Sequence, residues 1–205
     1  MEAVLKVTPI PHGLEDVLGQ SGLPRSPGLH MSQLYGDLNA EMEPGRFSSG
    51  GKPPPMLTEP GVMFEQWFEQ QLVQRWGPTI GERPEEQLTA EGIAYSPDLF
   101  IYDDVKGLVL GEIKFTWKSS RELPKTPTNS LPEKYGYYLR QMKCYCYHLQ
   151  IRYARLFVFC CMGDWDRSKL DPQLRAFDIE FTQRELDECW AAVRNNAIHK
   201  GLLTL

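Results

Sequence analysis

The spacing of apolar residues changes from helical to strand-like along the middle of the chain. Over residues 62–75 apolar side chains recur at near-helical spacing, which predicts an amphipathic helix that ends at Gly77-Pro78. The segments that follow are rich in β-forming residues and are separated by Gly or Asp. They predict three strands, at residues 85–92, 93–104 and 106–117. The last two strands are expected to form a hairpin.

The second half of the chain repeats this alternation of helix and strand. After a proline-containing loop, the pattern predicts a helix at residues 133–152, strands at 154–163 and 174–182, and a final helix at 183–201. Helices interleaved with strands are typical of a sheet covered by helices. We therefore expect a fold of the α/β (α+β) class, with a central mixed sheet flanked by helices.

The first residues of the chain lack this regularity. Residues 1–58 are rich in Pro and Gly and predict an extended arm, with one short helix around residues 31–38. Residues 59–205 are expected to form a single domain, which suits a chain of 205 residues. No apolar stretch at the start is long enough for a signal peptide or a membrane helix, so a cytoplasmic protein is expected, bacterial or in an infected host.

Charge is distributed unevenly around a net value of -5. Residues 106–155 contain ten Lys and Arg but three Asp and Glu, so the rest of the chain is strongly acidic. Such a basic segment could follow a nucleic-acid backbone, or it could be an ordinary solvated surface. The five cysteines form no CxxC pair and are expected to be buried, reduced thiols.

The predicted hairpin carries the residues of greatest chemical interest. If Asp103 pairs with Gly107, the same register sets Asp98 opposite Glu112, and Lys114 then lies on the same face. Two neighbouring carboxylates repel each other unless a cation separates them, and Mg²⁺ prefers oxygen ligands of this kind. Glu112 interrupts an otherwise apolar strand, which indicates an internal site. The alternative is an exposed salt bridge with Asp98 at a strand start.

These residues resemble the PD-(D/E)xK nuclease superfamily. The resemblance rests on Pro97-Asp98, followed after thirteen residues by Glu112-Ile113-Lys114. It implies a restriction-endonuclease-like core in which Asp98, Glu112 and the carbonyl of Ile113 bind Mg²⁺ or Mn²⁺. Lys114 would then orient the attacking water or help to deprotonate it, so that Asp98, Glu112 and Lys114 are the expected catalytic residues.

Two further motifs resemble the RecB-like and phage exonuclease branch of that superfamily. Gly61 precedes Glu65 by four residues, which implies Glu65 as a third metal ligand, with Glu69 one helical turn later as the alternative. Gln141 and Tyr145 match a QxxxY motif, which implies contacts to the active-site lysine or to the DNA backbone.

The resemblance implies a metal-dependent deoxyribonuclease, with an exonuclease in recombination, repair or phage DNA metabolism favoured. Lys118 and Arg140 are expected to contact DNA beside Gln141 and Tyr145, and Trp117 could stack on a base. A recombination or replication protein is a further expected partner. No cysteine precedes Cys144, so no iron–sulfur cluster is expected. A structure-specific or restriction-like endonuclease and a non-catalytic nucleic-acid-binding protein remain the alternatives.

Overall fold

The computed structural model describes residues 27–45, 55–77, 80–81, 87–117, 119–124, 131–132, 135–161 and 174–204. In chain order its elements are β1 (Leu29–His30), α2 (Met31–Met42), α3 (Pro55–Trp76), β2 (Ile80–Gly81), β3 (Leu88–Ala90), β4 (Ile93–Tyr95), β5 (Leu99–Asp103), β6 (Gly107–Thr116), the 3-10 helix η2 (Ser120–Glu122), α4 (Gly136–Leu149), β7 (Tyr153–Cys160), β8 (Leu174–Glu180) and α5 (Gln183–His199).

Two mixed sheets form the centre of the structure. The larger has the strand order β2-β5-β6-β7-β8, in which only β6 and β7 run parallel, and the smaller has the order β1-β4-β3. Parallel neighbours need a crossover connection, and α4 provides it between β6 and β7. The expected α/β class, with a mixed sheet flanked by helices, is confirmed.

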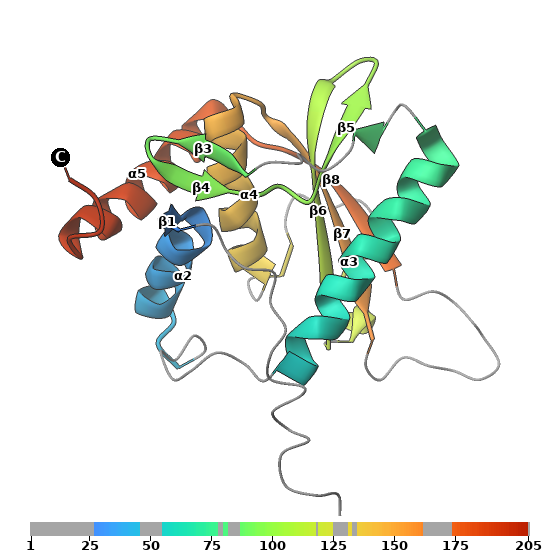
Figure 1. Cartoon of the computed structure of the whole chain (residues 1–205), viewed down its shortest axis with the longest axis horizontal. Coiled ribbons are helices and arrows are strands. Elements are labelled where there is room, and N and C mark those ends of the chain that lie inside the picture. The colour runs from blue at the N-terminus through green and yellow to red at the C-terminus, as the bar shows by residue number, and fades with distance from the viewer. Residues whose placement is uncertain are drawn as a thin grey trace, which may run out of the picture.

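Helices cover both faces of the five-stranded sheet (Figure 1). Helix α3 packs on one face, where Phe68 and Leu72 bury Val109 and Ile113. Helix α4 packs on the other, and α2 and α5 lie against α4 in a second, larger core that includes Leu110 and Trp190. Strand β6 lies between these two cores, so side chains that alternate along it enter different environments.

The β5–β6 hairpin has the register expected from the sequence. Asp103 pairs with Gly107 and Leu99 pairs with Gly111. The Asp103 carboxylate closes the turn by accepting hydrogen bonds from the backbone N–H groups of Val105 and Lys106, both at 2.9 Å. These bonds to the anion lower the pKa of Asp103. The hairpin therefore fixes which residues of β6 lie beside the start of β5.

The single strand expected over residues 93–104 is wrong. It divides into β4 in the small sheet and β5 in the large one, with Ser96, Pro97 and Asp98 between them. Proline has no N–H to donate to a ladder, which favours a break at this position. The division frees Asp98 from regular strand pairing while keeping it next to β5.

Helix α2 extends the short helix expected near residues 31–38. Met31 and Leu34 are fully buried, and the helix packs against α4 and α5. A boundary at residue 58 stays a prediction, although the part of the expected arm that forms α2 belongs to the main core. Within the described residues, no helix has the length and apolar character needed to cross a membrane.

None of the five cysteines, all within the described residues, forms a disulfide, and the expected burial is confirmed for three of them. Cys144, Cys146 and Cys160 are buried, while Cys161 and Cys189 are partly exposed. Burial raises the pKa of the Cys146 thiol to about 12, which keeps it protonated and inert.

Candidate active site

The candidate site lies where one edge of β6 loses its neighbour. Strand β5 begins at Leu99, opposite Gly111, so among the described residues only β7 pairs with the part of β6 that starts at Glu112. Helix α3 passes close to this stretch, since a Cβ on Gly61 would lie 3.8 Å from that of Phe115. Side chains from α3, β6 and the β4–β5 connection can therefore meet at this edge.

The structure brings Asp98, Glu112 and Lys114 together. The Lys114 ammonium forms an ion pair with Glu112 Oε1 and lies 4.0 Å from Asp98 Oδ2. Asp98 is held from the strand itself, because the backbone N–H of Ile113 donates to its Oδ2 at 2.7 Å. The Ile113 side chain points the other way, into the core beneath α3. The alternation expected from the sequence therefore holds across these three positions.

Glu112 is enclosed more completely than a structural ion pair requires. It has no exposed surface, whereas the Lys114 side chain is 17% exposed. Burial and the neighbouring Asp98 raise the pKa of Glu112 to about 8, against the opposing effect of Lys114. Burial lowers the pKa of Lys114, but Glu112, Asp98 and Glu65 outweigh it and raise that pKa well above its ordinary value.

One oxygen of this buried carboxyl has no partner. Gln141 and Lys114 both donate to Glu112 Oε1, while Oε2 is buried without a hydrogen bond. An unpaired buried carboxylate oxygen is costly, and a hard cation held by oxygen ligands would compensate it. The Glu112 and Asp98 carboxylates therefore fit a divalent cation, and Mg²⁺ would complete its coordination with water.

Helix α3 brings Glu65 near this centre. Its charge raises the pKa values of both Glu112 and Lys114. Within the described part of the chain, however, no three His, Cys, Asp or Glu side chains form a ready-made ligand cluster. A cation at this site would therefore complete its shell with water, backbone or substrate oxygens.

Helix α4 presents a polar and aromatic face to the acids. Gln141 contacts Glu112, and the Lys114 ammonium lies 5.8 Å from the centre of the Tyr138 ring. Tyr145, one helical turn after Gln141, is only 4% exposed and is therefore shielded from solvent.

Two tyrosines at the site were missed by sequence reasoning. Tyr138 is one turn before Gln141, so its place on the same face of α4 was readable from the helical period. Tyr35 of α2 is near enough to Lys114 and Glu112 for their charges to affect its pKa, which burial raises. Its signal was the helical spacing of Met31, Leu34 and Tyr35, which predicts burial but not contact with the site.

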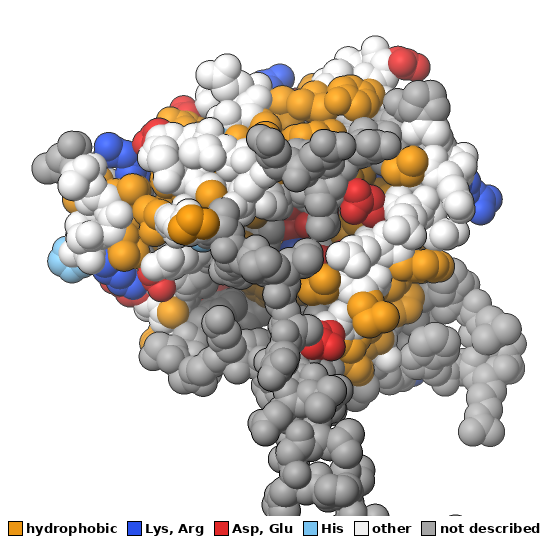
Figure 2. Space-filling view, viewed as in Figure 1, with side chains coloured by type: hydrophobic (Ala, Val, Ile, Leu, Met, Phe, Trp, Pro, Cys, Tyr) orange, Lys and Arg blue, Asp and Glu red, His pale blue; other side chains and the backbone are white. Residues whose placement is uncertain are grey.

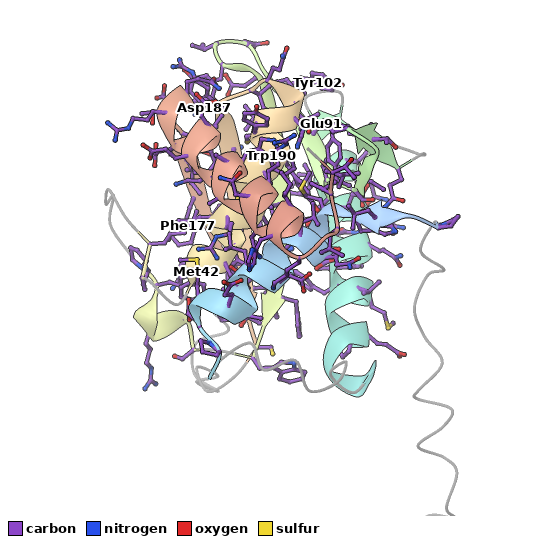
Figure 3. All side chains as sticks on the ribbon, turned by 90° about the vertical axis from the view of Figure 1, so that its left-hand side faces the viewer. Met42, Glu91, Tyr102, Phe177, Asp187 and Trp190 are labelled. Atoms are coloured by element: carbon purple, nitrogen blue, oxygen red, sulfur yellow. The ribbon has the colours of Figure 1, made fainter. Side chains whose placement is uncertain are left out.

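Of the residues expected to contact DNA, Gln141 lies at this cluster, whereas the Arg140 side chain lies apart from it. The Arg140 guanidinium donates to Met42 Sδ at 3.1 Å, so it lies at the end of α2 labelled in Figure 3. Lys118 lies outside the described residues. Trp117 is 45% exposed and packs edge-on against Phe115, which is compatible with base stacking or with an ordinary surface ring.

Much of the basic segment is balanced by acids from β8 and α5. Lys106 and Arg155 both pair with Asp178, at 3.6 and 2.6 Å. Arg152 pairs with Glu180 at 3.7 Å and Lys143 with Glu185 at 3.2 Å. Among the described residues of the segment 106–155, the basic side chains therefore do not form one continuous basic surface, because acidic side chains of β8 and α5 pair with several of them.

The surface is hollowed near the cluster. Figure 2 shows acidic and basic side-chain atoms at the bottom of a recess between α3 and the layer formed by α2 and β4. The elements on its two sides are those that supply Glu65 and Tyr35.

Two proteins of known structure that have a similar fold are exonucleases. A phage-related exonuclease from Haemophilus somnus 129PT has a TM-score of 0.53 at 13% identity, over 93% of this chain and 100% of its own. LHK-Exo, an alkaline exonuclease from Laribacter hongkongensis solved in complex with dAMP, has a TM-score of 0.50 at 16% identity, over 84% of this chain and 87% of its own. At these identities the likeness shows the fold alone.

Sequence comparison adds no assignment to the structural likeness. No family model matches the chain, and no curated protein matches it.

Proposed function

We propose that this protein is a divalent-metal-dependent deoxyribonuclease that acts as an exonuclease. The observation that carries the proposal is the buried Glu112 carboxyl, with one oxygen held by Lys114 and Gln141 and the other without a partner. A protein that needed only stability would gain by an apolar residue here, because burying a charge is expensive. Metal-assisted cleavage of a phosphodiester would explain why the protein keeps a buried carboxyl that lowers its stability.

Each residue of the cluster has a distinct role in this proposal. Asp98, Glu112 and Glu65 would hold Mg²⁺ or Mn²⁺, with the carbonyl of Ile113 as a further ligand. The bound cation would lower the pKa of a coordinated water and neutralise charge on the phosphate. Lys114, kept protonated by the carboxylates, donates to the attacking water or to a phosphate oxygen. The Ile113 N–H fixes Asp98, so the strand itself sets the spacing of the two acids.

The similarity of the fold to solved exonucleases supports the proposal of exonuclease activity. Both similar structures are exonucleases, and one of them was solved with a deoxynucleotide. A role in recombination, repair or phage DNA metabolism follows from the QxxxY resemblance and is part of the same proposal. Gln141 would act at the active centre, while Lys118 and Arg140 would contact DNA farther from it.

The decisive experiment compares linear and covalently closed circular DNA. The wild type, incubated with Mg²⁺ or Mn²⁺, should shorten linear DNA and leave circles intact, and EDTA should stop the reaction. Glu112→Gln keeps the size of the side chain and should lower the initial rate roughly 10²- to 10³-fold, as expected when one preorganised electrostatic group is lost. Glu188→Gln removes a carboxylate from the exposed surface of α5 and is the matched control.

Three outcomes are distinguishable. Linear DNA that survives the wild type with both metals would overturn the enzyme proposal and leave a nucleic-acid-binding protein. Circles that are cut before the linear molecules are shortened would favour an endonuclease. A rate that Glu112→Gln and Glu188→Gln change equally would remove Glu112 from the active site.

A further inference from the structure

Three polar side chains meet on the small sheet, just before the connection that carries Asp98. Gln87 directly precedes β3, and its amide nitrogen donates to Ser96 Oγ at 3.1 Å. The same nitrogen lies 3.3 Å from Nδ1 of His30, the last residue of β1. An amide nitrogen carries two hydrogens, so it can serve both acceptors at once. Gln87, His30 and Ser96 thus form a polar clamp.

The strand register explains why these side chains meet. His30 pairs with Ala94 of β4, and the register of β3 with β4 continues to Gln87 opposite Ser96. Opposed residues project on the same face of a sheet, and so do residues two apart on one strand. The small methyl group of Ala94 leaves room for the Gln87 side chain to cross β4 and reach β1.

Burial makes the contact to His30 important for the fold. The His30 side chain is 8% exposed, and a buried polar group costs stability unless it is hydrogen-bonded. The Gln87 amide meets part of that need and uses its second hydrogen on Ser96, whose side chain is exposed. The buried ring therefore anchors an exposed position through one shared amide.

The anchored position is two residues before Asp98. Between them lies Pro97, which is buried and which restricts both its own φ and the conformation of the residue before it. On the other side of Asp98, Leu99 pairs with Gly111. The connection between the two sheets is therefore held at both ends, by the polar clamp and by the β5–β6 ladder.

Asp98 depends on this support because it lies between two strands. Its Oδ2 accepts the Ile113 N–H at 2.7 Å and lies 4.0 Å from the Lys114 ammonium. A shift of the connection would move the carboxylate along β6 and lengthen the hydrogen bond. The position of the backbone at residues 96–98 thus sets where the acid meets the strand.

We infer that Gln87 and Ser96 are positioning residues for Asp98: their hydrogen bond fixes the 96–98 connection so that the carboxylate stays on the Ile113 N–H. The inference deepens the proposed function and rests on it, because Asp98 is a proposed metal ligand there. Gln87 and Ser96 act through the backbone and touch neither the cation nor the scissile phosphate.

Hydrogen exchange of the Ile113 amide tests the inference without metal or DNA. This amide reports its bond to Asp98 directly, and NMR resolves it from its neighbours. Ser96→Ala removes the hydroxyl at an exposed position, and Gln87→Met removes the amide while keeping the length of the side chain. Each change should speed the exchange roughly five- to tenfold, the factor that corresponds to one ordinary hydrogen bond.

Matched variants separate this effect from general damage. Ser96→Thr keeps the hydroxyl and should behave as the wild type. Gln183→Met removes an exposed amide that donates to Asp187 on α5, and it should leave the Ile113 exchange unchanged. The Lys106 amide, at the turn of the hairpin, should exchange at the wild-type rate in every variant.

Metal binding and turnover should follow the exchange result. Ser96→Ala and Gln87→Met should each weaken Mn²⁺ binding, measured by calorimetry without DNA, roughly five- to tenfold. Their kcat on linear DNA should fall by a similar factor, while KM stays near the wild-type value. The double variant should lose little more than either single variant, because both changes remove the same bond. Additive losses would overturn the inference.

Three further results would overturn the inference. The first is an Ile113 exchange rate that neither Ser96→Ala nor Gln87→Met changes. The second is an equal acceleration of all amides along β6 with a lower stability in urea, since the clamp would then support only the fold. The third is a raised KM with an unchanged kcat, which would make Ser96 a DNA contact.

The outcomes separate this inference from the proposed function. A wild type that cuts no DNA with either metal would overturn the nuclease, while the Ile113 exchange still decides the inference. A wild type that cuts DNA, with exchange and Mn²⁺ affinity unaffected in Ser96→Ala and Gln87→Met, would overturn the inference alone.

Discussion

The two faces of β6 differ in what burial does for the protein. Toward α3, Ile113 and Phe115 join an aromatic layer in which Phe64 stacks 4.5 Å from Phe159. Toward α4, Glu112 and Lys114 occupy equally enclosed positions but place charges there. Adjacent residues of one strand therefore have opposite effects on stability: apolar burial stabilises the folded state, and charge burial destabilises it, a cost that the proposed function would explain.

The largest effect is expected when the polar face of β6 is made apolar. Replacing Glu112 by Leu and Lys114 by Met together removes the whole ion pair. Activity on linear DNA should fall at least roughly 10²-fold. The free energy of unfolding in urea should stay the same or rise by about 1–4 kcal/mol, because the enclosed Glu112–Lys114 pair no longer has to be desolvated and Asp98 keeps its hydrogen bond from the Ile113 N–H. A large loss of stability would mean that the pair is structural.

The opposite change weakens the apolar face. Ile113→Ala should lower the free energy of unfolding by about 2–5 kcal/mol, because a fully buried side chain leaves a cavity. The rate per folded molecule should change little, since Ile113 contributes to the site through its backbone. Val105→Ala, at a side chain that is 93% exposed, is the control and should stay within about 0.5 kcal/mol.

A substitution at Gly111 tests how closely β5 and β6 approach each other beside Asp98. A Cβ at this position would lie 2.5 Å from Leu99 Cγ, so Gly111→Ala must displace Leu99. We expect a loss of about 1–3 kcal/mol in unfolding free energy and a reduced rate, because Asp98 precedes Leu99 directly. Gly36→Ala in α2 meets nothing within 4 Å and should be neutral or stabilising. Equal effects of the two changes would contradict the tight approach.

Tyr138 sharpens the comparison on the polar face. Its ring lies 5.8 Å from the Lys114 ammonium, a contact that contributes about 0.5–2 kcal/mol. Tyr138→Leu should therefore reduce the rate several-fold, whereas Tyr138→Phe keeps the ring and should retain it. If Phe fails as Leu does, the hydroxyl and not the ring is the important group.

The smallest effect is expected from His148, which is remote from the acids in the α4–α5 core. Its ring lies 4.4 Å from that of Trp190, the α5 residue labelled in Figure 3, and its Nε2 has no hydrogen bond. Burial lowers the pKa of His148, although Glu91 opposes this, so the unfolded chain binds the proton more readily. The free energy of unfolding should therefore be highest above about pH 6.5 and should decrease as the pH falls below that value. His148→Phe should reduce that slope in thermal unfolding measured from pH 7 to 5.

Local patterns predicted the part of the site that lies on one hairpin. Period-two alternation and a turn at Asp103 were enough to set Asp98 beside Glu112 and Lys114, because register follows from the turn. The assignment of Gln141 to the same centre depended on the helical period and a motif. Contacts between distant segments were out of reach: nothing in the local spacing of α2 indicates that Tyr35 meets α4, or that Asp178 neutralises Arg155.

The division of residues 93–104 between two sheets shows a second limit. A continuous β-forming pattern predicts one strand, and only the missing N–H of Pro97 signals the break. The break lets Asp98 leave the ladder and accept the Ile113 N–H. A local irregularity that weakens the strand prediction is therefore the same feature that positions the acid.

The buried face of α2 has a practical consequence for dissecting this molecule. Met31 and Leu34 cover apolar side chains of the core that α4 and α5 share. A chain trimmed to begin at residue 59 would expose that patch to water and invite self-association. Poor solubility of such a fragment would then reflect the loss of α2 from the core. Its inactivity would not show whether Asp98 and Glu112 are catalytic.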